Sequence, residues 1–242
     1  MKTALITGAS HGIGKAIAQC LASHGIRLFL NCRSSEAELT TYAAQLTETF
    51  QVPCTPLIYD ISDHDQVHAM FEEIHTMHET VDILINNAGI SHIGLLQDMD
   101  IQEWNRVINT NLTSVFSCCK YAIPDMVSRK KGKIINISSM WGLTGASCEV
   151  AYSASKGGVN LFTQALAKEL APSNIQVNAI ACGVIDTRMN ACFDAEERAD
   201  LENEIPAGRF AAPEEVAAFV YQLLTAPEYL TGQIIPFDGG YL

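Results

Sequence analysis

Short apolar runs alternate with longer stretches of helical periodicity along the whole chain. The runs predict strands at Thr3–Thr7, Arg27–Asn31, Thr55–Asp60, Asp82–Asn86, Lys133–Ser138, Gln176–Ala181 and Gln233–Phe237. The clearest helices are expected between them, at Gly12–His24, Ser35–Phe50, Val67–His78, Ile101–Ser128, Tyr152–Leu170 and Pro213–Leu224. This alternation is typical of an α/β fold, a parallel sheet of about seven strands covered by helices on both faces.

The length of the chain suits a single domain spanning residues 1–242. Of these residues, 48% are hydrophobic, which is enough for one sizeable core. The segment Met189–Gly208 is acidic and rich in alanine and looks the least ordered. Because insertions after strand ends commonly cover binding sites, we expect residues 189–208 to form a substrate lid.

The formal net charge of -12 disfavours a nucleic-acid partner, which would need clustered Lys and Arg side chains. The compact basic run Arg129–Lys131 is interpreted as a solvated helix end. No segment is apolar enough to span a membrane, and no signal-peptide pattern precedes the first strand, so we expect a cytoplasmic protein. The eight cysteines are scattered without a CxxC pair, which favours reduced thiols over disulfides; no metal site is predicted.

A glycine-rich loop follows the first strand, with glycines at positions 8, 12 and 14. Such glycines let the backbone turn tightly and approach a pyrophosphate at the amino terminus of the next helix. The position of the loop predicts a Rossmann-type, doubly wound dinucleotide-binding fold. The residues expected at the cofactor here are Gly8, Ser10, His11, Gly12, Ile13 and Gly14.

The end of the second strand bears on the choice of cofactor. An acidic residue there binds the ribose 2′-hydroxyl of NAD, whereas arginine suits the 2′-phosphate of NADP. The chain has Arg33 and Ser34 at this point and no carboxylate before Glu36. We therefore expect NADP(H) to be preferred over NAD(H); the alternative is that Arg33 only projects into solvent.

Ser139, Tyr152 and Lys156 form the candidate reactive set. Tyr152 and Lys156 are four residues apart on one predicted helix, so their side chains share a face. A neighbouring ammonium lowers the pKa of a phenol and makes it usable as an acid and a base. A serine hydroxyl can stabilise developing charge on a substrate oxygen. Ser138 is the other candidate for this role. Successive strand residues face opposite ways, so only one of the two serines should reach the site.

These motifs together resemble the short-chain dehydrogenase/reductase family over nearly the whole chain. The matching segments are Thr7–Gly14, Asp60–Ile61, Asn86–Gly89, Asn111, Ser139 and Tyr152–Lys156. The resemblance implies that Tyr152 donates a proton to a carbonyl oxygen while nicotinamide delivers hydride to the carbon. It implies that Ser139 orients the carbonyl, that Lys156 binds the nicotinamide ribose, and that Asn111 holds a water in a proton relay.

The same resemblance places further residues at the cofactor. Asp60 and Ile61 would contact adenine, and Asn87, Ala88 and Gly89 would line the cleft, although Asn87 suits equally a role in tying strands together. Ile185 and Thr187 match positions that contact the carboxamide. The family's usual proline before glycine is replaced by Cys182, which we interpret as structural because no base or cation lies near it in the sequence.

Within the family, the chain most resembles bacterial 3-oxoacyl-(acyl carrier protein) reductases. That likeness implies reduction of a 3-oxoacyl thioester, an acyl-carrier-bound substrate docked partly on Arg129–Lys131, and a homotetramer. The apolar residues on several faces of Ile101–Ser128 and Tyr152–Leu170 also suit an oligomer. The alternatives are a small-molecule (sugar, polyol or hydroxysteroid) alcohol dehydrogenase and, more remotely, a non-catalytic NADP(H)-binding regulator.

Overall fold

The computed structural model describes residues 1–191 and 193–242, and its strands form one sheet. Seven strands follow the order β3-β2-β1-β4-β5-β6-β7, and every neighbouring pair is parallel. The strands are β1 (Thr3–Ile6), β2 (Arg27–Cys32), β3 (Cys54–Ile58), β4 (Ile83–Asn86), β5 (Gly132–Ser139), β6 (Ile175–Cys182) and β7 (Ile234–Phe237). The predicted Rossmann-type doubly wound sheet is confirmed.

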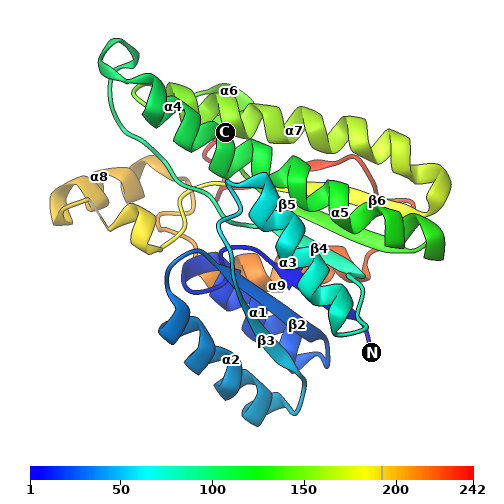
Figure 1. Cartoon of the computed structure of the whole chain (residues 1–242). Coiled ribbons are helices and arrows are strands. Elements are labelled where there is room, and N and C mark those ends of the chain that lie inside the picture. Colours follow the sequence, from blue (N-terminus) through cyan, green and yellow to red (C-terminus); the bar gives the residue numbers. More distant parts are fainter. Residues whose placement is uncertain (192) are drawn as a thin grey trace.

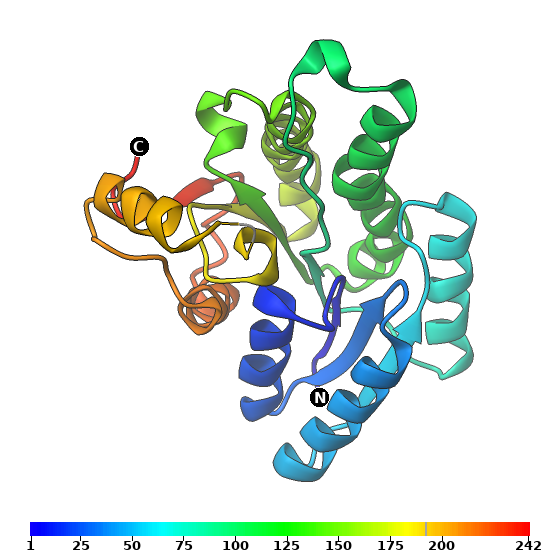
Figure 2. The ribbon, with the colours of Figure 1, turned by 90° about the vertical axis from the view of Figure 1, so that its left-hand side faces the viewer.

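Helices cover both faces of this sheet (Figure 1). They are α1 (Gly12–Ser23), α2 (Glu36–Phe50), α3 (His64–Thr76), α4 (Ile101–Ile108), α5 (Ser114–Arg129), α6 (Trp141–Thr144), α7 (Val150–Leu170), α8 (Ala195–Glu204) and α9 (Pro213–Thr225). One half of the core lies between the sheet and α1, α2 and α9, and the other between the sheet and α3, α5 and α7. In the view of Figure 2 these two groups of helices stand on opposite sides of the strands. Both faces are therefore buried, as the continuous apolar runs require.

The strand order reverses direction between β1 and β4. In such sheets the crevice outside the carboxyl ends of the strands at the reversal receives the ligand. Because the strands are parallel, β1, β4, β5 and β6 all end at this edge, and the loops that follow them begin there. The fold thereby gathers segments that are far apart in the sequence.

Two predicted elements differ from the observed ones. The stretch Ile101–Ser128 is not one helix, because a π-helical turn, η2 (Asn109–Thr113), separates α4 from α5. Residues 189–208 were expected to be poorly ordered, yet they hold the short 3-10 turn η4 (Arg188–Asn190) in part and all of α8. Asp194 caps α8 by accepting from the backbone of Glu196 and Glu197, and Glu197 bonds back to Asp194. This capping box starts a helix whose apolar periodicity is weak.

Smaller shifts of element ends have local causes. Helix α3 begins at His64 rather than Val67 because Asp63 accepts hydrogen bonds from the next turn. Within the described residues, no helix combines the length and apolar character needed to cross a bilayer.

Candidate active site

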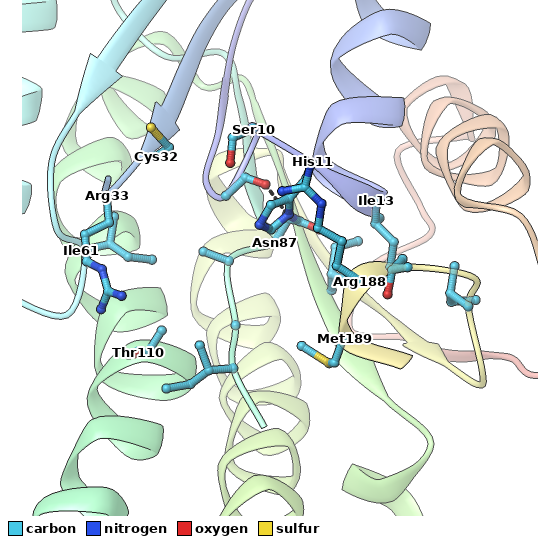
Figure 3. Close-up of a pocket in the computed structure, with 18 of the residues that line it drawn as sticks. Ser10, His11, Ile13, Cys32, Arg33, Ile61, Asn87, Thr110, Arg188 and Met189 are labelled. Atoms are coloured by element: carbon cyan, nitrogen blue, oxygen red, sulfur yellow. Dashed lines mark hydrogen bonds between the residues drawn. The ribbon is translucent and has the colours of Figure 1, made fainter. Parts of the chain in front are cut away.

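Two adjoining cavities open at the carboxyl edge of the sheet. The first, called here the switch-point cleft, has a volume of about 300 Å³ and runs past the ends of β1, β2, β4, β5 and β6 (Figure 3). The second, called the acidic cavity, has a volume of about 440 Å³ and lies between β5, α6 and α8. Ser139, Tyr152, Gly183, Met189 and Asn190 line both. A group held at this junction can face one molecule in each cavity.

Nearly all predicted site residues line the switch-point cleft. Those on its wall are Gly8, Ser10, His11, Gly12, Ile13, Arg33, Ser34, Asp60, Ile61, Asn87, Ala88, Gly89, Ser139, Tyr152, Lys156, Ile185 and Thr187. Gly14 and Asn111 lie behind the wall. The fold therefore unites motifs spread from the first strand to the sixth.

The glycine loop is shaped for close backbone approach. Gly8 has φ of +65°, and a Cβ there would lie 2.8 Å from the Cα of Ala88. A Cβ on Gly14 would lie 2.3 Å from the carbonyl oxygen of Gly8. His11 is the N-cap of α1 but makes no side-chain capping bond, which leaves the first N–H groups of the helix to an external acceptor. The loop is thus built to receive an anion.

Asn87 ties this loop to the neighbouring strand. Its Nδ2 donates to the carbonyl oxygens of Thr7, at 2.9 Å, and Gly8, at 3.1 Å. Its backbone N–H donates to Thr7 Oγ1. The strand-tying role is therefore present in the structure, and the side chain also borders the cleft.

Arg33 extends from the end of β2 and is largely exposed. One guanidinium nitrogen lies 4.0 Å from a carboxylate oxygen of Asp60. The other Asp60 oxygen accepts from the backbone and the hydroxyl of Ser62. Asp60 is therefore held in place after β3, and Arg33 stays free to turn toward an anion at the end of the cleft.

Tyr152 and Lys156 lie one turn apart on α7, as predicted. Lys156 is buried, its Nζ donates to the carbonyl oxygen of Ile137 at 2.8 Å, and it lies 5.7 Å from the centre of the Tyr152 ring. Burial lowers the pKa of Lys156 to about 8. Burial also raises the pKa of Tyr152, and a hydrogen bond with Ser139 opposes that shift.

The predicted lowering of the Tyr152 pKa is wrong for the protein alone. The desolvation of the phenol outweighs any stabilisation from Lys156, whose ammonium is engaged by a backbone carbonyl. At neutral pH, Tyr152 therefore carries its proton, which is the form that can act as an acid.

The two adjacent serines have different surroundings. Ser138 Oγ donates to Asn160 Oδ1 at 2.6 Å and is buried against α7. Ser139 Oγ accepts from the backbone N–H of Trp141 and borders both cavities. Ser139 is accordingly the serine placed to meet a second ligand.

Asn111 sits in the π-helical turn that interrupts the predicted helix. Its carboxamide donates to Ile90 O and Ser155 Oγ and accepts from Ile90 N–H. A Cβ on Gly89 would meet Asn111 Oδ1 at 3.3 Å and Lys156 Nζ at 3.4 Å, so both groups approach Gly89. π-turns recur at functional sites, where they aim a side chain that a regular helix would turn away.

Cys182 ends β6 and lines the switch-point cleft. Burial raises the pKa of its thiol to about 12, and Lys156 opposes this shift. The thiol is therefore neutral and poorly nucleophilic, which fits the structural interpretation. The local sequence supplies no cation near this thiol, but the fold brings Lys156 close.

The acidic cavity takes its name from Glu149, Glu197, Asp200 and Glu204. Along its described lining there is no Lys, Arg or His side chain, and the rest of the wall includes Trp141, Phe193 and Leu201. Glu149 lies on the turn before Tyr152, and burial raises its pKa. Helix α8 is held over the cavity by Arg198, which makes two bonds to Asp186 at 3.1 and 3.0 Å.

Sequence reasoning missed several residues of the cleft and the carboxylates of the acidic cavity, although Ser139, Tyr152 and residues of the expected lid 189–208 line that cavity. Arg188 lines the cleft directly after Thr187, and Ile90 and Thr110 are among the other residues of its wall. The adjacency of Arg188 to a predicted contact residue was a usable signal. The Asp194–Glu197 spacing, typical of a capping box, could have predicted the start of α8. Nothing in the local sequence indicated that Glu149 would line a cavity.

The basic run Arg129–Lys131 lies at the opposite edge of the sheet. Arg129 donates to Val81 O, pairs with Asp82 at 3.3 Å, and thus lies before β4 and β5. Ser139 stands at the far end of β5, roughly 23 Å away at the rise of a strand. The predicted docking patch therefore does not border the Ser139–Tyr152 site of its own chain.

Comparisons with known proteins agree with this architecture. The sequence model of the short chain dehydrogenase family matches residues 2–198. An uncharacterized oxidoreductase of Bacillus subtilis is 40% identical over 99% of this chain and 98% of that protein. A 3-oxoacyl-[acyl-carrier-protein] reductase of Aquifex aeolicus is 38% identical over 99% of this chain and 96% of that protein.

Solved structures show the same fold. That of a presumed gluconate dehydrogenase from Agrobacterium tumefaciens gives a TM-score of 0.94 at 33% identity and covers 99% of this chain and 95% of that one. That of a 3-oxoacyl-[acyl-carrier protein] reductase from Brucella melitensis gives 0.92 at 33% identity, covering 100% and 91%.

Proposed function

The chain belongs to the short-chain dehydrogenase family of oxidoreductases, and we propose that it reduces a carbonyl to a secondary alcohol with NADPH. One observation carries the proposal: Ser139 and Tyr152 stand where the switch-point cleft meets the acidic cavity, with Lys156 behind them. A hydride donor in the cleft and a carbonyl in the cavity would meet at these hydroxyls.

The cleft suits a nicotinamide dinucleotide. The uncapped amino terminus of α1 offers N–H groups to a diphosphate, and a Cβ at Gly8 would clash with the wall. The glycine loop and Asn87 would hold the diphosphate region, while Asp60 and Ile61 would border adenine. Arg33 would take a 2′-phosphate and give the preference for NADP(H). When bound, the nicotinamide supplies the hydride.

The chain's own residues manage the proton and the geometry. Ser139 Oγ donates a hydrogen bond to the carbonyl oxygen, and the Tyr152 hydroxyl gives that oxygen its proton. Tyr152 is protonated at neutral pH because burial raises its pKa. Lys156 stabilises the resulting phenolate and contacts the nicotinamide ribose. Asn111 orders a water through which Lys156 exchanges protons with solvent.

For the substrate, a 3-oxoacyl thioester is the first candidate, because relatives bearing that activity in their names match nearly the full chain. The test is the oxidation of NADPH and of NADH against a panel holding acetoacetyl thioesters, carrier-bound 3-oxoacyl groups, small diketones, sugars and ketosteroids. Turnover of the thioester with NADPH supports the proposal. Turnover of none of these carbonyls with either cofactor contradicts it.

The acidic cavity favours a second candidate, a small uncharged or cationic carbonyl or alcohol. Four carboxylates repel an anionic substrate and accept hydrogen bonds from hydroxyl or ammonium groups. The basic run that would attract a carrier lies at the other edge of the sheet. Strong NADPH or NADH oxidation with a sugar, or reduction of the oxidised cofactor with a polyol, together with negligible activity on thioesters would select this candidate.

We also propose a cytoplasmic homotetramer of single-domain chains in which residues 189–208 cover the substrate. Phe116 on α5 and Leu161 on α7 are 47% and 70% exposed, an apolar face that suits a partner subunit. Leu161→Asp should shift the mass measured by light scattering toward dimers or monomers. Tyr229→Asp, at a fully exposed residue elsewhere, is the matched control. A parent that is already monomeric would contradict the tetramer.

A further inference from the structure

Arg188 is a charged residue that lines the switch-point cleft and has no role in the mechanism described above. It belongs to η4, immediately after Thr187, and its side chain is 70% exposed. Arg33, Lys156 and Arg188 are the only Lys or Arg side chains on the described wall of the cleft. Because the net charge of the chain is -12, each of these three cations is important for attracting an anion to the cleft.

Two contacts place Arg188, one through its neighbour Thr187 and one through its own side chain. A Cβ on Gly12 would lie 3.3 Å from Thr187 Cγ2, so Thr187 packs at the first residue of α1. The Arg188 guanidinium reaches Glu38, in the first turn of α2, at 3.5 Å. In Figure 3 its side chain extends from η4 toward His11, the N-cap of α1. Arg188 therefore spans the open side of the cleft beside the amino terminus of α1.

The ion pair with Glu38 is weak enough to be exchanged. Both side chains are exposed, and exposed pairs contribute about 0–1 kcal/mol. A guanidinium can instead make two parallel hydrogen bonds to a phosphate, which are considerably stronger. The free N–H groups of α1 point to the same region, so an anion there would be held from two sides.

We propose that Arg188 is a cofactor-binding residue that leaves Glu38 and closes over the diphosphate of the bound dinucleotide. This inference rests on the proposed nicotinamide function, and it assigns a contact common to NADH and NADPH. Arg33, at the end of β2, would contact only the 2′-phosphate. The two arginines thus have separable effects on the two cofactors.

The test is fluorescence titration of the intact protein with NADPH and NADH. Arg188→Ala should raise both dissociation constants by about tenfold or more, as expected for a hydrogen bond to a charged group. It should also weaken ADP binding more than AMP binding. Arg33→Ala should affect NADPH alone. Glu38→Gln, which removes the competing carboxylate, should tighten both cofactors by about twofold.

Arg106→Ala is the matched control, because Arg106 is an exposed arginine paired with Glu103 on α4 and lines neither cavity. It should leave both dissociation constants within twofold of the parent values. An Arg188→Ala protein that binds NADH like the parent would overturn the proposal, whether or not NADPH binding weakens. A parent that binds neither dinucleotide would contradict the proposed function itself.

Discussion

The switch-point cleft and the acidic cavity meet at Tyr152 but are built on different principles. The cleft is made largely of backbone and small neutral side chains at strand ends, with three cations around it. The cavity is made of side chains from α6, α8 and the turn before α7, with four carboxylates and aromatic groups. The first suits an anionic ligand, whereas the second suits an uncharged or cationic one. The two regions can therefore be tested separately, one through cofactor binding and the other through substrate choice.

The largest effect should come from the residue that joins the two regions. Tyr152→Phe keeps the ring and removes the proposed proton donor, so turnover should fall by about two to four orders of magnitude. NADPH binding, measured by fluorescence, should remain close to that of the parent because the cleft is otherwise unchanged.

Tyr221→Phe controls for the loss of a phenol, since Tyr221 stacks on His24 at the carboxyl end of α1 and lines neither cavity. That variant should turn over normally. Turnover within tenfold of the parent in Tyr152→Phe would contradict the role of Tyr152 as the acid.

The next effect concerns the stability cost of burying Lys156. Its pKa is about 8 when folded and near 10.5 in an exposed lysine, so between these pH values the unfolded chain binds more protons. Stability therefore rises with pH in this window and falls as the pH drops toward 8. Relative to Lys156→Met, the parent should gain up to about 3 kcal/mol of unfolding free energy between pH 8 and 10.5.

Denaturant titrations across that pH range measure the difference. Lys168→Met, at an exposed position on the same helix, should show no comparable change relative to the parent. A parent and a Lys156→Met variant whose stabilities run parallel from pH 8 to 10.5 would show that Lys156 titrates normally.

The sequence predicted the cleft well because its motifs are contiguous and each has a backbone reason. The glycines after β1 occupy positions where a Cβ would clash, and the Tyr152–Lys156 spacing places both side chains on one face of α7. The seven strands were recognised for the same reason, since buried parallel strands are continuous apolar runs. Only their ends shifted, by one or two residues, as at Cys54–Ile58.

What the sequence did not predict depends on burial and long-range contact. The raised pKa of Tyr152 and the lowered pKa of Lys156 follow from desolvation, which spacing along a helix does not reveal. The π-turn around Asn111 is stabilised by bonds to Ile90 and Ser155. The distance of Arg129 from the site follows from which strand end it precedes, and that needs the sheet topology.

A third, smaller effect tests how the switch-point cleft distinguishes NADPH from NADH. Arg33→Ala should weaken NADPH binding by about 1.5–3 kcal/mol, the range for a hydrogen bond to a charged group. NADH binding should change little, because that dinucleotide has no 2′-phosphate. A parent that prefers NADH in titrations would overturn the role given to Arg33.

The smallest effect tests the acidic cavity. Glu149→Gln with Asp200→Asn removes one half-buried and one exposed negative charge from its wall, and a single charge facing solvent is worth only a fraction of a kcal/mol at 0.1 M salt. The KM of a carboxylate-bearing or carrier-bound ketone should fall by about threefold. The KM of an uncharged diketone should stay the same.

Acid should act on the parent in the same direction as these substitutions. Burial raises the pKa of Glu149, so this carboxylate is neutralised earlier than an exposed one as the pH falls. The KM for the anionic substrate should therefore drop with pH in the parent, and less so in Glu149→Gln. Charge reversal at Arg129 and Lys130 should leave it within twofold, since these residues lie at the opposite edge of the sheet. A large rise in KM from that reversal would mean that a carrier docks there and reaches the site of a partner subunit. The acidic cavity would then select the reacting group, and the distant basic run would select its carrier.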